Sequence, residues 1–365
     1  MKTKRYFGLL TAGLIIFSTS CKKDDTGAPV APPSIPTNVV VITKDIATPT
    51  TWSGDSVYVI KKQDFHVKNT LTIKPGAIIK FHPTEGRNIT LDGSGTINAS
   101  GNASKPIIFT SYKDDKNGGD CNGDGNTTSP EKGDWDEINT NGMQGSNFAY
   151  CYFMYGGGGS YKSTLELDNS AATVSHCIFA HNKGGKDGSY YYGALAANEA
   201  LKGTVIKDNR FYDNELPLSI NTTFDIDNSN SFESEDASVK NTYNGIFLEN
   251  GNEFDDNVKW EETEVAFVID DNDLWINGTH SLQLADNVVI KFVQNSTLTL
   301  ANGVSNLINY DGSGVVFTSY KDDSYKGDTN GDGNATTPAN GDWSGIYDDQ
   351  NSTWLSRSNI LYSSH

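Results

Sequence analysis

Positive charge is scarce in this sequence. Its 365 residues carry 28 Lys and Arg against 46 Asp and Glu, which gives a formal net charge of −18 at pH 7. Because a nucleic-acid site needs a basic surface to neutralise phosphates, this balance argues against a nucleic-acid partner. An acidic surface instead favours solubility and the binding of divalent cations.

The apolar run at the N-terminus is short. Residues 7–17 follow a basic start and are too few to cross a bilayer. Ser-Thr-Ser before Cys21 resembles a bacterial lipoprotein signal, with Ser18 in the position that usually holds Leu. We therefore expect a signal peptide at 1–20 and lipidation of Cys21. The alternative is an ordinary cleaved signal peptide followed by a chance cysteine.

The segment after Cys21 has the composition of a tether. Residues 22–25, Lys-Lys-Asp-Asp, resemble the surface-export signal of Bacteroidota lipoproteins, although a solvated linker would look similar. Residues 26–38 are rich in Pro, Ala and Thr, which is typical of an extended chain without a core. The sequence thus predicts a flexible tether at 21–44. It also predicts an outer-membrane lipoprotein displayed on the cell surface and held to the membrane by its lipid alone.

Sustained helical periodicity is absent after the signal peptide. Short β-branched or aromatic runs, bounded by Gly, Asn, Asp or Pro, recur from about residue 45 and predict strands. Phe153, Phe179 and Phe211 lie in similar segments 26 and 32 residues apart, and Asn182 and Asn214 follow the last two at the same offset. Such spacing predicts an all-β, parallel β-helix with stacked Phe and Asn side chains. A β-sandwich is the competing fold.

Two segments of the chain are near copies. Residues 109–135 and 317–343 align without a gap, 208 positions apart, and 19 of 27 residues are identical. The flanking sequences also match, so we expect one β-helix unit at 45–250 and a second, truncated unit at 251–365 that continues the first.

Each copy contains Asp-x-Asn-x-Asp-Gly, a pattern of oxygen ligands on a tight loop that suits Ca²⁺. The twelfth position, which is Glu in an EF-hand, is Glu131 in one copy and Ala339 in the other, so an inserted loop is expected rather than an EF-hand. Asp114, Asp115, Asp322 and Asp323 are outer candidates. A polar turn without metal is the alternative. The expected calcium ligands are Asp120, Asn122, Asp124, Asn126 and Asp134, and Asp328, Asn330, Asp332, Asn334 and Asp342.

The strand runs and loops together resemble a known group. The segment LTIKPGAIIKF, followed by GTINASGNASKPIIFTS and GDxNGDGN with GDW, resembles right-handed parallel β-helix proteins of bacterial surfaces within the pectate-lyase-like superfamily. The resemblance implies the fold and a surface setting. We expect a non-catalytic glycan-binding, adhesive or display module that structural calcium stabilises, with an extracellular polysaccharide or cell-surface glycan as its ligand. The alternative is a polysaccharide lyase or glycoside hydrolase.

Catalytic residues are not assigned by the sequence, which has no Ser-His-Asp pattern, zinc spacing or phosphate loop. Lys80, Arg87, Arg210 and Lys291 are the basic candidates, and Asp168, Asp187 and Asp213 could be collinear. An aromatic surface for sugar stacking is expected from Tyr190, Tyr191, Tyr192 and Tyr212, with packing as the alternative for alternate members. Cys151 and Cys177 lie one coil apart and suit either a thiol ladder or a disulfide. The oligomeric state is not predicted.

Overall fold

The computed structural model describes residues 38–160, 163–187, 190–249, 253–254, 256–270 and 273–365. These residues belong to one compact unit, Pro33–His365. The predicted signal peptide, Cys21 and most of the tether lie outside the described residues. Within the described ranges, no helix has the length and apolar character needed to cross a membrane.

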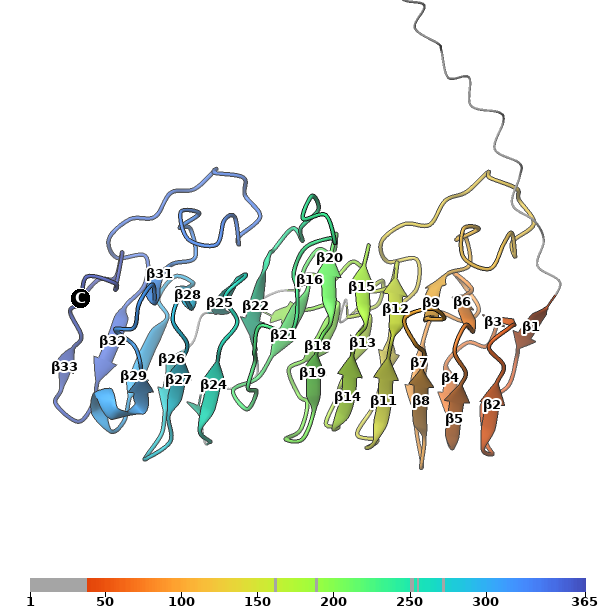
Figure 1. Ribbon diagram of the computed structural model, residues 1–365, viewed down its shortest axis with the longest axis horizontal. Coiled ribbons are helices and arrows are strands. Elements are labelled where there is room, and N and C mark those ends of the chain that lie inside the picture. Colours follow the sequence, from red (N-terminus) through yellow and green to blue (C-terminus); the bar gives the residue numbers. More distant parts are fainter. Residues whose placement is uncertain (1–37, 161–162, 188–189, 250–252, 255, 271–272) are drawn as a thin grey trace, which may run out of the picture. The chain divides into compact units, whose positions relative to one another are not determined.

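The predicted fold class is confirmed: the chain is an all-β, right-handed parallel β-helix (Figure 1). Successive coils place their strands in three parallel sheets along the first part of the chain, so each strand pairs with its counterpart one coil later. A seven-stranded sheet contains β1 (Val39–Ile42), β3 (Val57–Ile60), β6 (Ile78–Phe81), β9 (Ile107–Ser111), β12 (Cys151–Met154), β15 (Ile178–Ala180) and β20 (Arg210–Tyr212).

The other two sheets of the first part complete each coil. A six-stranded sheet contains β2 (Thr50–Trp52), β5 (Thr70–Ile73), β8 (Thr96–Ser100), β11 (Ser146–Ala149), β14 (Ala172–Ser175) and β19 (Val205–Lys207). A ten-stranded sheet runs through both predicted units and contains β4 (Phe65–Val67), β7 (Ile89–Leu91), β10 (Ile138–Asn139), β13 (Leu165–Glu166), β18 (Leu195–Ala197), β21 (Leu218–Ile220), β22 (Gly245–Leu248), β25 (Ala266–Ile269), β28 (Val289–Phe292) and β31 (Val316–Ser319).

The last part of the chain adds two shorter sheets. A five-stranded sheet contains β23 (Glu253–Phe254), β26 (Asp273–Ile276), β29 (Thr297–Leu300), β32 (Gly345–Asp348) and β33 (Thr353–Trp354), and a three-stranded sheet contains β24 (Val258–Trp260), β27 (Leu282–Leu284) and β30 (Leu307–Ile308). The antiparallel hairpin β16 (Gly185–Asp187) and β17 (Tyr190–Tyr192) packs against the coils through the buried Tyr191, and a short 3₁₀ turn, η1, spans Gly303–Asn306.

The predicted tether ends earlier than its composition indicated. Residues Val39–Ile42 form β1, which pairs in parallel with β3. The physical reason is the Val-Val-Val-Ile run, because β-branched side chains favour the extended backbone. Among the described residues, the β-helix therefore begins with β1, at the edge of the seven-stranded sheet, and not at residue 45 as the sequence predicted.

The core confirms the predicted ladders. Phe153 and Phe179 stack with ring centroids 4.7 Å apart, Phe179 and Phe211 with 5.0 Å, and all three are fully buried. The Asn182 Nδ2 donates to Asn214 Oδ1 at 2.9 Å, and a third asparagine, Asn241, accepts from Asn214 Nδ2 at 2.9 Å. The inward amides thus satisfy one another at the turns, where backbone groups would otherwise be buried without partners.

The buried cysteines stack beside this ladder. Cys151 and Cys177 are free thiols, and the Cys151 backbone N–H points to Cys177 Sγ at 3.5 Å. Both thiols also contact backbone carbonyls of neighbouring coils, Cys151 that of Ala99 and Cys177 that of Phe148. This arrangement is the thiol ladder, one of the two alternatives left open by the sequence.

The duplicated segments occupy different sheets. Lys80 lies on β6 of the seven-stranded sheet and pairs with Thr110, whereas the matching Lys291 lies on β28 of the ten-stranded sheet and pairs with Thr318. The repeat is therefore displaced by one sheet around the coil. As a result, one duplicated loop follows β9 and the other follows β31.

Candidate functional site

The two duplicated loops are built alike at their bases. In the first, the Asp134 carboxylate accepts from Ser111 Oγ at 2.6 Å and pairs with Lys113 Nζ at 2.7 Å. In the second, Asp342 accepts from Ser319 Oγ at 2.7 Å and pairs with Lys321 Nζ at 2.7 Å. The predicted ligands Asp134 and Asp342 therefore close the loops onto the ends of β9 and β31, away from the carboxylate groups described next.

Three carboxylates converge within each loop. Asp115, Asp120 and Asp124 have one oxygen each within 4.8 Å of one another, and Asp323, Asp328 and Asp332 repeat this arrangement. The structure thus brings two predicted ligands of each loop together with one outer candidate, Asp115 or Asp323. Burial raises the pKa of Asp115 and of Asp323, and repulsion from the neighbouring carboxylates raises it further.

One carboxylate oxygen in each group has no protein partner. Oδ1 of Asp115 and Oδ1 of Asp323 are buried and accept no hydrogen bond among the described residues. By contrast, Asp120 Oδ1 accepts from the Gly123 N–H at 2.6 Å, and its Oδ2 accepts from the Gly125 N–H at 2.9 Å. A buried oxygen without a donor is costly, and a cation among the three carboxylates would remove that cost in both copies.

The predicted asparagine ligands occupy two kinds of position. Asn122 Nδ2 donates to Asp124 Oδ2 at 2.8 Å, and Asn330 Nδ2 donates to Asp332 Oδ2 at 3.0 Å, so both side chains lie at the edge of the carboxylate groups. Asn126 and Asn334 are exposed. The residues that fit an oxygen-ligand site best are thus the three aspartates with Asn122 or Asn330 beside them.

A buried lysine supports each loop from below. Lys80 Nζ donates to the carbonyls of Asp114 at 2.8 Å and Gly119 at 2.6 Å. Lys291 Nζ donates to the Gly327 carbonyl at 2.8 Å and to Thr329 Oγ1 at 2.7 Å. Burial lowers the pKa of Lys291 to about 8, opposed by the nearby aspartates. These two basic candidates therefore hold the loops in place and do not face a groove.

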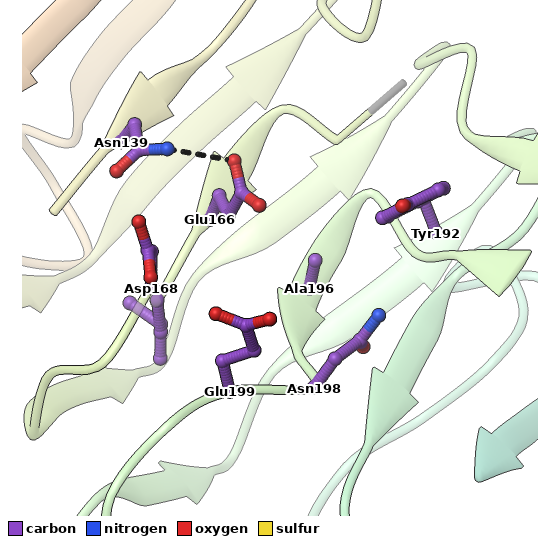
Figure 2. A pocket seen from close by; sticks show the side chains of 8 residues that line it. Asn139, Glu166, Asp168, Tyr192, Ala196, Asn198 and Glu199 are labelled. Atoms are coloured by element: carbon purple, nitrogen blue, oxygen red, sulfur yellow. Dashed lines mark hydrogen bonds between the residues drawn. The ribbon is translucent and has the colours of Figure 1, made fainter. Parts of the chain in front are cut away.

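A separate acidic pocket lies on the outer face of the ten-stranded sheet. Adjacent strands β10, β13 and β18 place Asn139, Glu166 and Ala196 in one outward row. The cavity holds about 150 Å³ (Figure 2). Its lining consists of Asn139, Glu166, Leu167, Asp168, Tyr192, Ala196, Asn198 and Glu199.

Two carboxyl pairs border this pocket. Glu137 hydrogen-bonds Glu166, and burial with the neighbouring carboxylates raises the pKa of both groups. Asp168 hydrogen-bonds Glu199, and burial followed by this contact raises the pKa of Glu199. Two carboxyl groups in contact share a proton because the doubly ionised pair repels itself. The pocket can therefore hold protons near neutral pH.

The amides of Asn139 and Asn198 line the pocket, and that of Asn169 lies beside two of its acids. Asn139 Nδ2 donates to Glu166 Oε2 at 2.8 Å, as drawn in Figure 2. Asn169 Nδ2 donates to Asp168 Oδ1 at 2.7 Å and to Glu199 Oε2 at 3.1 Å. Asn198 is 8% exposed, and its Oδ1 is a buried acceptor without a partner in the described part of the chain.

The predicted tyrosines separate into different environments. Tyr192 lines the acidic pocket, and Tyr190 is 54% exposed. Tyr191 is buried with its ring 4.6 Å from that of Phe247, so alternate members of the triplet face opposite sides of the hairpin. Tyr212 is half-buried with its ring edge toward His181. Only Tyr192 of the four joins the pocket.

The other sequence candidates pair elsewhere. Asp213 accepts from Lys132 at 2.9 Å and contacts His181 at 2.6 Å, and Arg87 pairs with Asp136 at 2.7 Å. The side chain of Asp187 lies outside the described residues. Sequence reasoning identified Asp168 but missed Glu137, Glu166 and Glu199. Their one signal is the coil spacing, because 137 and 166, and 168 and 199, are about one coil apart.

Comparison with known proteins identifies the architecture. Residues 44–125 match the model of a family described as a pectate-lyase like beta helix domain. No curated protein and no solved structure matches the chain significantly. The matched segment is thus similar to that family, and the parallel sheets continue the β-helix architecture through the rest of the described residues.

Proposed function

We propose that this protein is a surface lipoprotein whose β-helix binds a glycan in the acidic pocket on the ten-stranded sheet. The observation that carries the proposal is the pocket lining: an aromatic ring, amides and carboxyl groups converge on one small cavity. Sugars stack on aromatic rings through their C–H faces and exchange hydrogen bonds with amides and carboxylates. The sequence features of residues 1–25 supply the anchoring part of the proposal.

In this proposal the duplicated loops bind Ca²⁺ and have a structural role. The support is the repeated group of three aspartates with one unpartnered buried oxygen in each copy. Carboxylate oxygens are the ligands that Ca²⁺ prefers. The ion would hold the long loop compact over the coil that carries β9 or β31, and it would add nothing to chemistry in the pocket.

A second candidate function is hydrolysis of the bound glycan. The specific observation that favours it is the raised pKa of the Glu137 and Glu166 pair, which keeps a proton beside the pocket. Hydrolysis of a glycosidic bond needs one protonated carboxyl as acid and one carboxylate as base or nucleophile. Glu166 would supply the acid, and Asp168 on the same coil would supply the carboxylate.

The experiment is a screen of the purified full chain against immobilised plant, algal and host polysaccharides, scored for retention and for released product. We expect retention on at least one glycan, and loss of retention in Tyr192→Ala. Tyr152→Ala is the matched control because Tyr152 is half-buried on β12 of a different sheet. Retention without product supports the binding module, and product that disappears in Glu166→Gln supports the hydrolase. No retention on any glycan, or equal loss in both tyrosine variants, refutes the pocket as a glycan site.

A further inference from the structure

The acidic pocket has an unbalanced lining. Three of the eight lining residues, Glu166, Asp168 and Glu199, are carboxylic acids, and none is Lys, Arg or His. Glu137 adds a fourth carboxyl group behind Glu166. The whole chain carries a formal charge of −18, so the surrounding field has the same sign as the pocket. A polyuronate would therefore meet repulsion at this site, with no cation in the lining to bind its carboxylates.

The hydrogen-bonding groups that the pocket offers to a ligand are mainly acceptors. The amide donors of Asn139 and Asn169 already serve Glu166, Asp168 and Glu199. What remains is mainly acceptor capacity, and it includes the buried Oδ1 of Asn198, which no described residue satisfies. A ligand that suits this lining must bring donors and positive charge. An ammonium group offers three donors and no acceptor.

An ammonium group would also resolve the crowding of the acids. Within each pair, one carboxyl group contacts another. A cation placed between the two pairs would favour the ionised form of these carboxyl groups. Hydrogen bonds between an ammonium and a carboxylate are about twice as strong as neutral ones. A neutral sugar would form weaker hydrogen bonds and would leave each carboxyl pair sharing its proton.

We propose that the pocket selects a glycan that carries free amino groups, a polymer or oligomer of 2-amino-2-deoxy sugars, over neutral and anionic glycans. The inference rests on the proposed glycan-binding function and specifies its ligand class. Glu166, Asp168 and Glu199 receive the ammonium, Asn198 Oδ1 accepts a further N–H or O–H, and Tyr192 stacks against the sugar ring.

The test is isothermal titration of the full chain with three oligosaccharides of equal length. One is a glucosamine tetramer, the second its N-acetylated counterpart, and the third a galacturonate tetramer. We expect the glucosamine tetramer to bind at least roughly tenfold more tightly than the N-acetylated one, because charge-assisted hydrogen bonds replace neutral ones. Binding should weaken as salt rises, and the galacturonate tetramer should not bind.

Variants locate the effect. Glu166→Gln with Asp168→Asn should remove the preference for the amino sugar, whereas Glu261→Gln should keep it, because Glu261 is an exposed carboxylate outside the lining. Equal affinity for the two glucosamine tetramers, or an unchanged preference in the double variant, overturns the inference while leaving the glycan-binding function standing. If spermidine binds as tightly as the amino sugar, the inference is also overturned, since the site would then recognise positive charge alone and not the sugar. Failure of all three oligosaccharides and of the polysaccharide screen refutes the proposed function itself.

Discussion

The indole of Trp135 lies flat on the ring of Phe81, with centroids 4.0 Å apart and an interplanar angle of 3°. The same relationship joins Trp343 to Phe292 at 3.9 Å and 4°. Each indole N–H donates to a backbone carbonyl at 2.8 Å, that of Met154 or of Leu361. These stacks fasten the end of each duplicated loop to the core.

We expect Trp135→Ala to lower the free energy of unfolding by about 3–5 kcal/mol, because it removes a fully buried ring and leaves a cavity under the loop. Trp135→Phe should cost less, since it keeps part of the stack and loses the N–H bond and the rest of the ring contact. Trp354→Ala is the control, because Trp354 is half-buried on the terminal strand β33. Urea denaturation followed by circular dichroism measures all three. If Trp135→Ala and Trp354→Ala lower the free energy of unfolding by equal amounts, the stack does not anchor the loop.

Calcium should stabilise the folded protein by mass action. Binding to the folded state alone adds roughly 2.7 kcal/mol per site when free Ca²⁺ is a hundredfold above its Kd. Chelation should therefore lower the Tm, and Ca²⁺ should restore it better than Mg²⁺, which prefers a smaller, octahedral site. Thermal melts with chelator, Ca²⁺ and Mg²⁺ measure the effect. If the chelator leaves the Tm unchanged and no calcium is found after gentle purification, the loops are polar turns without a metal.

The aspartates of the loops should divide into two roles. Asp115→Asn and Asp120→Asn should each remove one calcium per chain, because their oxygens converge with that of Asp124. Asp134→Asn should lower stability with both calcium ions retained, because its carboxylate pairs with Lys113. Metal content per chain together with the Tm distinguishes the roles. Loss of one calcium in Asp134→Asn, with none lost in Asp115→Asn, would restore the ligand set expected from the sequence.

Glu262 should make stability depend on pH. It is fully buried, and burial raises its pKa from 4.5 to about 7. A carboxyl whose pKa is raised in the folded state stabilises the fold at low pH, and this contribution is lost as pH rises from about 4.5 to about 7. At about 1.4 kcal/mol per pKa unit, the upper bound is roughly 3 kcal/mol.

Glu262→Gln should therefore flatten the fall of the Tm between pH 5 and pH 8. The amide keeps the oxygen that accepts the Glu264 N–H and cannot ionise. Glu261→Gln is the matched control, since Glu261 is the exposed neighbour. The measurement is a series of thermal melts from pH 4.5 to pH 8.5. An identical pH profile in Glu262→Gln and the unmodified protein would exclude this glutamate as the cause.

Lipidation at Cys21 should determine whether the protein is found in the membrane fraction or in the soluble fraction. Cys21→Ala should move the protein from the membrane fraction to the soluble fraction, because stable anchoring needs acyl chains that only the cysteine can carry. Fractionation of cells that produce each form, with protease digestion of intact cells to report surface display, measures the result. Membrane retention of Cys21→Ala would contradict the lipoprotein assignment.

The sequence by itself was sufficient for the fold. Phe153, Phe179 and Phe211 repeat at coil-length intervals with Asn182 and Asn214 behind the last two, and in a parallel β-helix such intervals become stacks. The architecture could be predicted because each coil contacts mainly its neighbours along the chain. The convergence of Asp120 with Asp124, and of Asp328 with Asp332, was equally local, since a tight turn with Gly brings them together.

The tertiary structure alone decided the contacts that depend on coil register. Asp115 rather than Asp134 joins Asp120 and Asp124, because the buried Lys80 and the Lys113 pair fold the loop in two places. Glu137, Glu166, Asp168 and Glu199 meet only because the long insertion after β9 returns in register with β7 and β13. A shift of one residue in that return would turn Glu137 and Asn139 from the outer face to the core, and the composition of the chain does not specify this register.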